Sequence, residues 1–231
     1  APGGSFGSEA PAASQTQNQH AWEVGLRHST STRTAVFARA QRSFRLVNAD
    51  EIYEPDENFS NSFQILRPQT VQSFDLGAEW RVERNAVRVT FFQMDIDDEI
   101  HLDAFTAGTG NTNLPPSRRK GVEVETMWQA ARKLGLSAGY AFTDAKFREG
   151  VLPGGPFVID TDIDIAGRKV PLVPAHKVNL GVVWDVMEGA RLSASFTSLS
   201  KQYMDNDEPN TLGIQIPAYS LLDVKVAREF G

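Results

Sequence analysis

The histidines are the first side chains whose type could support chemistry. All four stand apart from one another, without the short spacings of a metal-binding strand or helix: His20, His28, His101 and His176. None of them belongs to an HExxH sequence. The chain has no cysteine, which excludes thiolate ligands, disulfides and a cysteine nucleophile. We therefore expect no metal centre built on these residues and no resident cofactor.

Acidic residues are clustered more densely. The clusters fall at a predicted strand end, in a DTDIDI sequence and in a later loop: Asp95, Asp97, Asp98 and Glu99; Asp160, Asp162 and Asp164; Asp205, Asp207 and Glu208. Several carboxylate oxygens would suit calcium, but the spacing and glycine of an EF-hand are missing. Paired carboxylates could also serve a glycosidase, which needs a defined separation that sequence does not give. We favour solvated loop charge and leave calcium open.

The chain lacks the common signatures of catalysis and nucleotide binding. It contains no GxSxG, Walker A or GxGxxG sequence, so we expect no enzymatic activity. Its net charge of -6 argues against a nucleic-acid partner, which would require a basic face. No stretch approaches the ~18 consecutive apolar residues of a transmembrane helix.

Along most of the chain, apolar and polar side chains alternate with the two-residue period of a β-strand. Phe74, Leu76 and Ala78 share one face, for example, while Ser73 and Asp75 share the other. This alternation predicts nine strands: 21–28, 34–44, 70–84, 86–102, 119–131, 134–147, 176–186, 191–203 and 217–228. The strand at 86–102 carries apolar residues on both faces, which either a bulge or a contact inside the sheet would explain.

The predicted strands are long and their connections alternate in length. Soluble strands usually run ~5–6 residues, whereas a tilted membrane-spanning strand needs ~9–11. The short connections are 29–33, 84–85, 132–133 and 187–189, and the long ones are 45–69, 103–118, 148–175 and 204–216. Short turns on one side and long loops on the other are typical of an outer-membrane barrel. Alternating lipid and lumen faces also explain a mean hydropathy of only -0.32.

The tryptophans fit the same barrel. Trp80, Trp128 and Trp184 lie on apolar faces shortly before short turns, and Trp22 lies at the opposite end of its strand. Such positions predict aromatic rings at the two membrane interfaces. The opposite faces would line a polar lumen with Glu79, Arg81, Glu123, Glu125, Asp185, Asp223 and Lys225. In a soluble sheet the tryptophans would instead be core residues.

Seven segments carry family-like residues in a fixed order. Residues 43–55 (SFRLVNADEIYEP) are similar to a pattern F-R-x-P-N-x-x-E-L-Y, with Val47 where proline is usual. The other six are LRPQTVQSFDLGAEW (66–80), FFQMDIDDEI (91–100), RRKGVEVE (118–125), YAFTDAKF (140–147), VPLVPAHKVNLGVVW (170–184) and AYSLLDVKV (218–226). Together they resemble TonB-dependent outer-membrane receptors of the siderophore-receptor type, in the C-terminal part of the barrel.

The resemblance implies an all-β, antiparallel transmembrane β-barrel of 22 strands, of which this chain would supply about nine. Residues 1–19 would be a loop or disordered lead-in, and residues 20–231 a partial barrel without the plug domain. A barrel of that size needs ~220 residues in its strands alone, and bacterial barrels have even strand numbers. We therefore expect a part of a barrel, and one that does not fold alone because its edges are unpaired.

The implied function is uptake of a scarce nutrient, most plausibly an iron–siderophore complex, across the bacterial outer membrane. Its partners would be outer-membrane lipid, the soluble ligand and the TonB complex, the last through an N-terminal part missing here. In the long loops, Arg45, Tyr53, Arg168 and Tyr203 are the candidate ligand-binding residues, since arginine suits anionic chelates and tyrosine offers a ring and a donor. A soluble all-β ligand-binding domain and an outer-membrane barrel enzyme remain alternatives.

Overall fold

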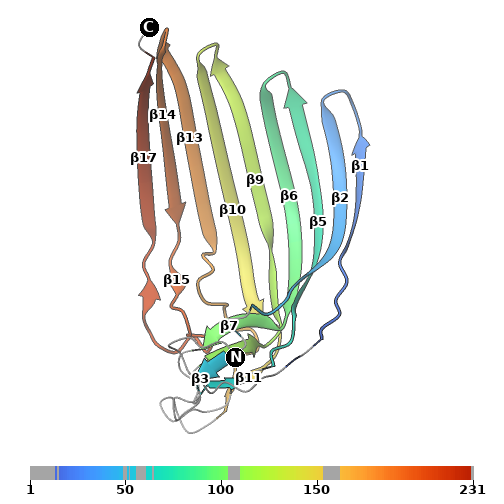
Figure 1. The fold of residues 1–231 in the computed structure, drawn as a ribbon. Coiled ribbons are helices and arrows are strands. Elements are labelled where there is room, and N and C mark those ends of the chain that lie inside the picture. The colour runs from blue at the N-terminus through green and yellow to red at the C-terminus, as the bar shows by residue number, and fades with distance from the viewer. Residues whose placement is uncertain are drawn as a thin grey trace.

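Nine long strands form one antiparallel sheet in the order β1-β2-β5-β6-β9-β10-β13-β14-β17 (Figure 1). The computed structural model describes residues 14, 16–48, 51, 53–55, 61–63, 65–103, 110–152 and 162–229, without the side chains of 53–55, 61–63, 103 and 110. The long strands are β1 Trp22–Ser29, β2 Thr34–Arg45, β5 Gln69–Val82, β6 Asn85–Asp97, β9 Ser117–Ala131, β10 Leu134–Phe147, β13 His176–Met187, β14 Ala190–Leu199 and β17 Tyr219–Arg228. The nine predicted strands are thus confirmed, and most of the predicted 1–19 lead-in lies outside the described residues.

Three predicted strands end earlier than the alternation suggests, and the one expected at 70–84 stops at Val82. The strand expected at 86–102 stops at Asp97, because Asp98 adopts a left-handed backbone conformation with φ 56°. The strand expected at 191–203 stops at Leu199 and pairing resumes at Gln202. A left-handed residue cannot continue the pleat, so the chain leaves the sheet after Asp97.

The long loops contain short hairpins of their own. These pairs are β3 Tyr53–Pro55 with β4 Asn61–Phe63, β7 Glu99–Asp103 with β8 Gly110–Leu114, β11 Val151–Leu152 with β12 Ile163–Asp164, and β15 Gln202–Tyr203 with β16 Gln215–Ile216. All four lie at one end of the sheet, while the tight turns lie at the other (Figure 1). The predicted segregation of loop length is therefore confirmed. Among the described residues, no helix is long and apolar enough to cross a membrane.

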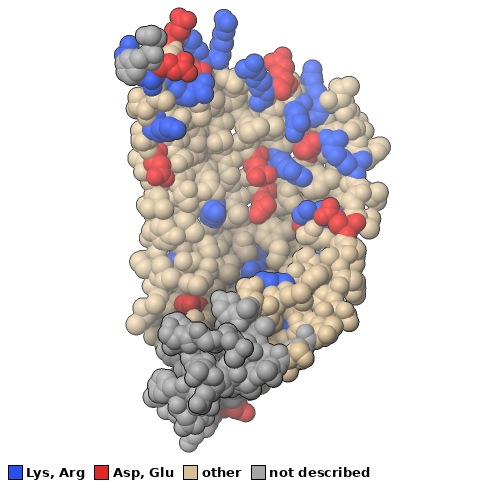
Figure 2. All heavy atoms as spheres, viewed as in Figure 1, with Lys and Arg blue, Asp and Glu red and all other residues tan. Residues whose placement is uncertain are grey.

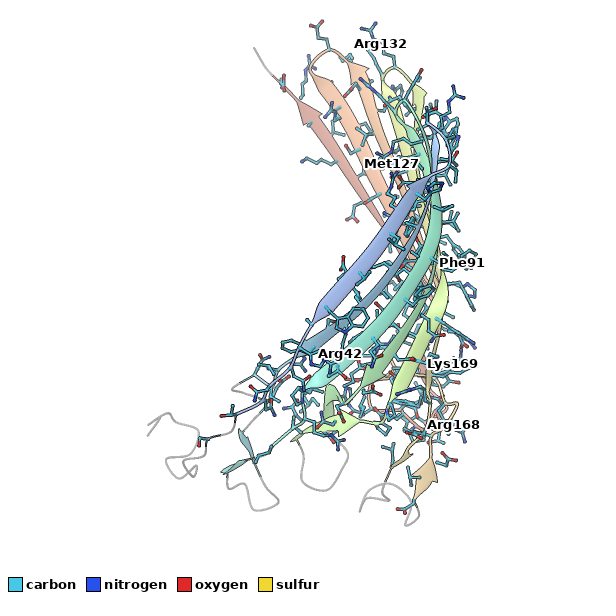
Figure 3. All side chains as sticks on the ribbon, turned by 90° about the vertical axis from the view of Figure 1, so that its right-hand side faces the viewer. Arg42, Phe91, Met127, Arg132, Arg168 and Lys169 are labelled. Carbon is cyan, nitrogen blue, oxygen red and sulfur yellow. The ribbon has the colours of Figure 1, made fainter. Side chains whose placement is uncertain are left out.

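The two faces of the sheet show burial opposite to that of a soluble protein. On β5, Phe74 and Leu76 are 51% and 50% exposed, whereas Ser73 and Asp75 between them are only 8% and 9% exposed. The sheet curves so that the apolar face is convex and the polar face concave. Figure 3 shows Phe91 on the convex side and Met127 on the concave side. An exposed apolar face and a sheltered polar face suit lipid outside and water inside.

Apolar residues on both faces of β6 have a local explanation. Its register with β5 and β9 runs without a shift, so no bulge is present. Instead, Phe92 lies opposite Gly121 on the concave face, and Phe37 of β2 lies opposite Gly77 in the same way. A Cβ added to Gly77 would come within 2.4 Å of the Phe37 Cζ, so the ring covers the glycine closely. Glycine gives each aromatic ring room to lie flat on the sheet.

The tryptophans lie at the predicted ends of their strands. Trp80 and Trp128, on the convex face near the short turns, stack with ring centroids 6.5 Å apart and an interplanar angle of 18°. Trp184 lies near the turn end of β13, and Trp22 begins β1 at the loop end. Trp22, Trp128 and Trp184 are 46%, 46% and 45% exposed. These rings are therefore not core residues of a soluble sheet.

A small hydrophobic core lies among the loops. It joins the ends of β8 and β10 to the segment that follows β12, through Leu114, Ala145, Phe147, Ile165 and Val170. Phe147 is 2% exposed and Ile165 is fully buried. This core holds the long loop after β10 against the end of the sheet.

Candidate functional site: the concave wall and the loop layer

The concave wall over β1, β2 and β5 is lined with ion pairs. Arg39 donates to Asp75 with Nε 2.8 Å from Oδ2, and Arg27 pairs with Glu79. The Arg88 guanidinium lies 4.4 Å above the centre of the Phe37 ring. Figure 2 shows this face, with charged side chains spread over the strands at the right of the view. Such paired charges are suited to a wall in contact with water.

A hollow of about 440 Å³ opens on this wall. Its lining combines apolar, cationic and acidic side chains from four strands: Phe37, Arg39, Gln41, Ser73, Asp75, Arg88, Thr90, Phe92, Gln93, Met94, Glu123 and Glu125. Glu123 and Glu125 are exposed, and neither has an ion pair in the described structure. The wall can therefore accept basic groups from whatever fills the lumen, and offers no nucleophile paired with a base among the residues described.

The concave wall over β10, β13 and β14 is different. Its side chains are small or hydroxylated along most of each strand: Gly135, Ser137, Gly139, Gly181, Ser193, Ser195 and Thr197. The left part of Figure 2 shows few charges in this region. One part of the wall is therefore densely charged, while the other is lined mainly by small side chains, with charges such as Lys177 and the Asp185–Arg191 pair toward the strand ends.

Side-chain amides fasten neighbouring loops to one another. Asn113 accepts from Arg67 N at 2.8 Å and donates to the carbonyls of Arg67 and Asp98. Asn210 does the same for Lys169, accepting from its N at 2.7 Å and donating to its carbonyl at 3.0 Å. Each asparagine side chain thereby satisfies the backbone N–H and carbonyl of one residue in another loop, as a neighbouring strand would do in a sheet.

Two further contacts complete this loop layer, which we define as residues 65–68, 98–103, 110–114, 162–175 and 200–216. Asp207 is 1% exposed, and its Oδ1 accepts from Thr211 N at 2.7 Å, which closes its own turn. His101 Nε2 lies 3.1 Å from Asn206 Oδ1 and 3.6 Å from the carboxylate of Glu208. Strand β7 is therefore joined to the loop after β15.

The four candidate ligand-binding residues lie in different environments. Arg45 is already engaged, with its Nη1 2.9 Å from both carboxylate oxygens of Glu51. Arg168 is exposed in the loop layer, and Tyr203 is half-buried with its carbonyl bonded to Leu172 N. The side chain of Tyr53 lies outside the described part. The structure does not bring these residues into one described pocket.

Most of the acidic residues at the end of β6 serve in ion pairs. Asp95 is held by both Nε and Nη2 of Arg118, at 2.6 and 2.9 Å. The neighbouring pairs are Asp97 with Arg148, Asp98 with Arg67 and Glu99 with Arg119. Over the described ranges, no group of three or more histidine, aspartate or glutamate side chains could hold a metal ion. Asp160 lies outside those ranges. Sequence reasoning missed the arginine partners, because each pair joins two strands or loops.

Comparison with known proteins identifies the class of barrel. Residues 2–230 match the family model described as TonB dependent receptor-like, beta-barrel. The chain therefore belongs to this family, whose barrels reside in the bacterial outer membrane. The resemblance inferred from the sequence motifs is confirmed, as are the all-β fold and the antiparallel sheet.

Individual relatives are distant. The chain is 22% identical over 217 residues to the ferrioxamine receptor of Yersinia enterocolitica, covering 88% of this chain and 28% of that protein. The siderophore receptor PiuA from Acinetobacter baumannii shares the fold with a TM-score of 0.63 and 17% identity, over 90% of this chain and 29% of that one. The copper transporter OprC shares it with a TM-score of 0.64 and 14% identity, over 90% and 31%. The chain thus spans less than a third of the length of these relatives.

Proposed function

We propose that the protein takes up an iron–siderophore complex across the outer membrane by TonB-dependent transport. The observation that carries this proposal is the family match over nearly the whole chain. The sheet agrees with it, since its concave wall is polar and its convex face is apolar. The distant ferrioxamine and siderophore receptors supply the substrate class. In this proposal the protein binds and passes its ligand and carries out no covalent chemistry.

In this proposal, each part of the structure has its own role. The loop layer receives the ligand, since it lies at the end of the sheet opposite the short turns (Figure 1). The charged half of the concave wall faces a plug domain, whose basic groups would meet Glu123 and Glu125. The TonB complex supplies energy from the inner membrane through the plug. Outer-membrane lipid covers the convex face.

A deletion strain tests this function. Loss of the gene should abolish uptake of radioactive iron delivered as one ferric siderophore from a panel, and deletion of TonB should have the same effect. Unchanged iron uptake with every siderophore in the panel would contradict the proposal. Because a copper transporter shares the fold, copper accumulation in the same strains is the second measurement. A copper defect with normal iron uptake would favour a copper substrate.

Arg168 and Tyr203, both in the loop layer, are the first residues to change, followed by Arg45 of β2 and Tyr53 of β3. Arg168→Ala should raise the concentration for half-maximal uptake by at least about tenfold, as expected for one charge-assisted hydrogen bond to an anionic chelate. Arg132→Ala is the matched control, because Arg132 lies in a short turn at the other end of the sheet (Figure 3). Equal effects of both changes would show that Arg168 has no special part in binding.

A further inference from the structure

A row of cations crosses three neighbouring segments on the convex face, just beyond the apolar band toward the loops. The last apolar row in register is Phe91, Val122 and Phe142. Four residues further along each strand on the same face, Arg118 of β9 lies opposite Lys146 of β10, and Lys146 lies opposite Lys169. Figure 3 shows Lys169 on the same convex side as Phe91.

Direct juxtaposition of like charges is unfavourable unless anions separate them. Here Asp144 lies between the two lysines, paired with Lys169 and 3.3 Å from Lys146 Nζ. Asp95 holds Arg118 from the other side. A fourth cation, Lys120, occupies the intervening row opposite Asp144, is exposed, and has no ion pair in the described part of the chain. Four cations therefore share two carboxylates.

The position of this row indicates its partner. Residues immediately beyond the apolar band of an outer-membrane barrel lie at the depth of lipid headgroups, where lysine and arginine attract anionic lipids. The cations remain accessible, since the side chains of Arg118, Lys146 and Lys169 are 42%, 45% and 42% exposed. Lysine binds phosphate as a point charge, and arginine adds two donors in a fork.

We propose that Arg118, Lys120, Lys146 and Lys169 form a site for the phosphate group of an anionic membrane lipid on the outer wall of the barrel. A lipid phosphate would enter between Lys120 and Lys146 and share these cations with the Asp144 carboxylate. The inference depends on the convex face meeting the membrane, and not on the iron–siderophore substrate. Its failure would therefore leave the proposed uptake untouched.

The test uses the intact protein that contains this chain, purified in phosphatidylcholine mixed micelles and titrated with fluorescent phosphatidic acid. Lys120→Gln combined with Lys146→Gln should weaken binding about 30-fold, since each basic residue near an anionic surface contributes about fivefold. The matched control removes two lysines from the concave wall, Lys177→Gln with Lys225→Gln, and should change binding less than about twofold by the same reasoning. Equal weakening in both double variants, or no preference for phosphatidic acid over phosphatidylcholine, would overturn the proposal.

Two further arms separate the remaining explanations. Asp144→Asn removes the competing carboxylate and should tighten phosphatidic acid binding, whereas a purely structural aspartate would leave affinity unchanged or reduce it. Inorganic phosphate at the lipid's own concentration should not displace the probe. Displacement would identify a soluble anion as the ligand and refute the assignment to lipid. Folding of every variant is checked by the mobility of the unheated barrel on a gel.

Discussion

The membrane-spanning sheet and the loop layer bury opposite kinds of side chain. In the sheet, Leu76 is half exposed while the adjacent Asp75 is 9% exposed. At the loop end of the sheet, Phe147 of β10 and Ile165 of the loop layer are 2% and 0% exposed, and they belong to an ordinary hydrophobic core. The difference shows that one chain meets two solvents: lipid replaces the missing core outside the sheet, while the loops must exclude water by packing.

The largest expected effect tests the loop core. Phe147→Ala should destabilise the packing of residues 162–175 by about 3–5 kcal/mol, because removal of a buried ring loses transfer energy and leaves a cavity. Phe91→Ala, the same change on the lipid face, should cost less, since lipid chains fill the space. Amide hydrogen exchange of the intact protein measures both. Equal costs would mean that the convex face is packed against protein.

The next effect tests the lipid face. Leu76→Arg should destabilise the folded barrel by about 2–4 kcal/mol, the cost of a cation near the bilayer midplane. Thr90→Arg places the same side chain on the concave wall, opposite Glu123, and should be tolerated. Urea unfolding in lipid vesicles gives the comparison. Tolerance of Leu76→Arg would argue against lipid contact at this face.

A smaller effect concerns a glycine of β9 that lies against an aromatic ring of β6. A Cβ on Gly121 would lie 1.8 Å from the Phe142 carbonyl oxygen and 3.0 Å from the Phe92 ring. Gly121→Ala should therefore cost about 1–3 kcal/mol through overpacking. Gly139, where a Cβ would meet nothing closer than 3.9 Å, provides the control. If Gly139→Ala were as costly in the same urea titration, the loss of a strand glycine in general, and not the close contacts at Gly121, would be responsible.

The smallest effect concerns the side-chain hydrogen bonds that join neighbouring loops. Asn210→Ala removes three hydrogen bonds. It also places an alanine in the left-handed conformation, at φ 57°, which alanine adopts less readily than asparagine. We expect about 1–2 kcal/mol of local destabilisation, seen as faster hydrogen exchange at 203–212. Asn210→Gly keeps the backbone conformation accessible and isolates the hydrogen bonds. No change in exchange for either variant would show that the loop is held by other contacts.

The sheet could be predicted from sequence because its signal is local. Alternation along Phe74, Leu76 and Ala78 needs only the two-residue period of a strand, and loop lengths can be counted directly. The mixed pattern of β6 could not be resolved in this way, since Phe92 and Phe37 find their glycines on neighbouring strands. The ion partners of the acidic residues were missed for the same reason. Arg118, for example, reaches Asp95 from 23 residues away.

Sequence alone therefore determined the strands, the side of the turns, the membrane face and the family. Tertiary structure decided which loops are fastened together, since Asn113 binds Arg67 across 46 residues and His101 meets Asn206 across 105. It also showed that Arg45 is occupied by Glu51 while Arg168 is exposed. The physical reason is the range of the interactions. Strand periodicity is written in adjacent residues, whereas hydrogen bonds and ion pairs between loops depend on where the sheet carries their ends.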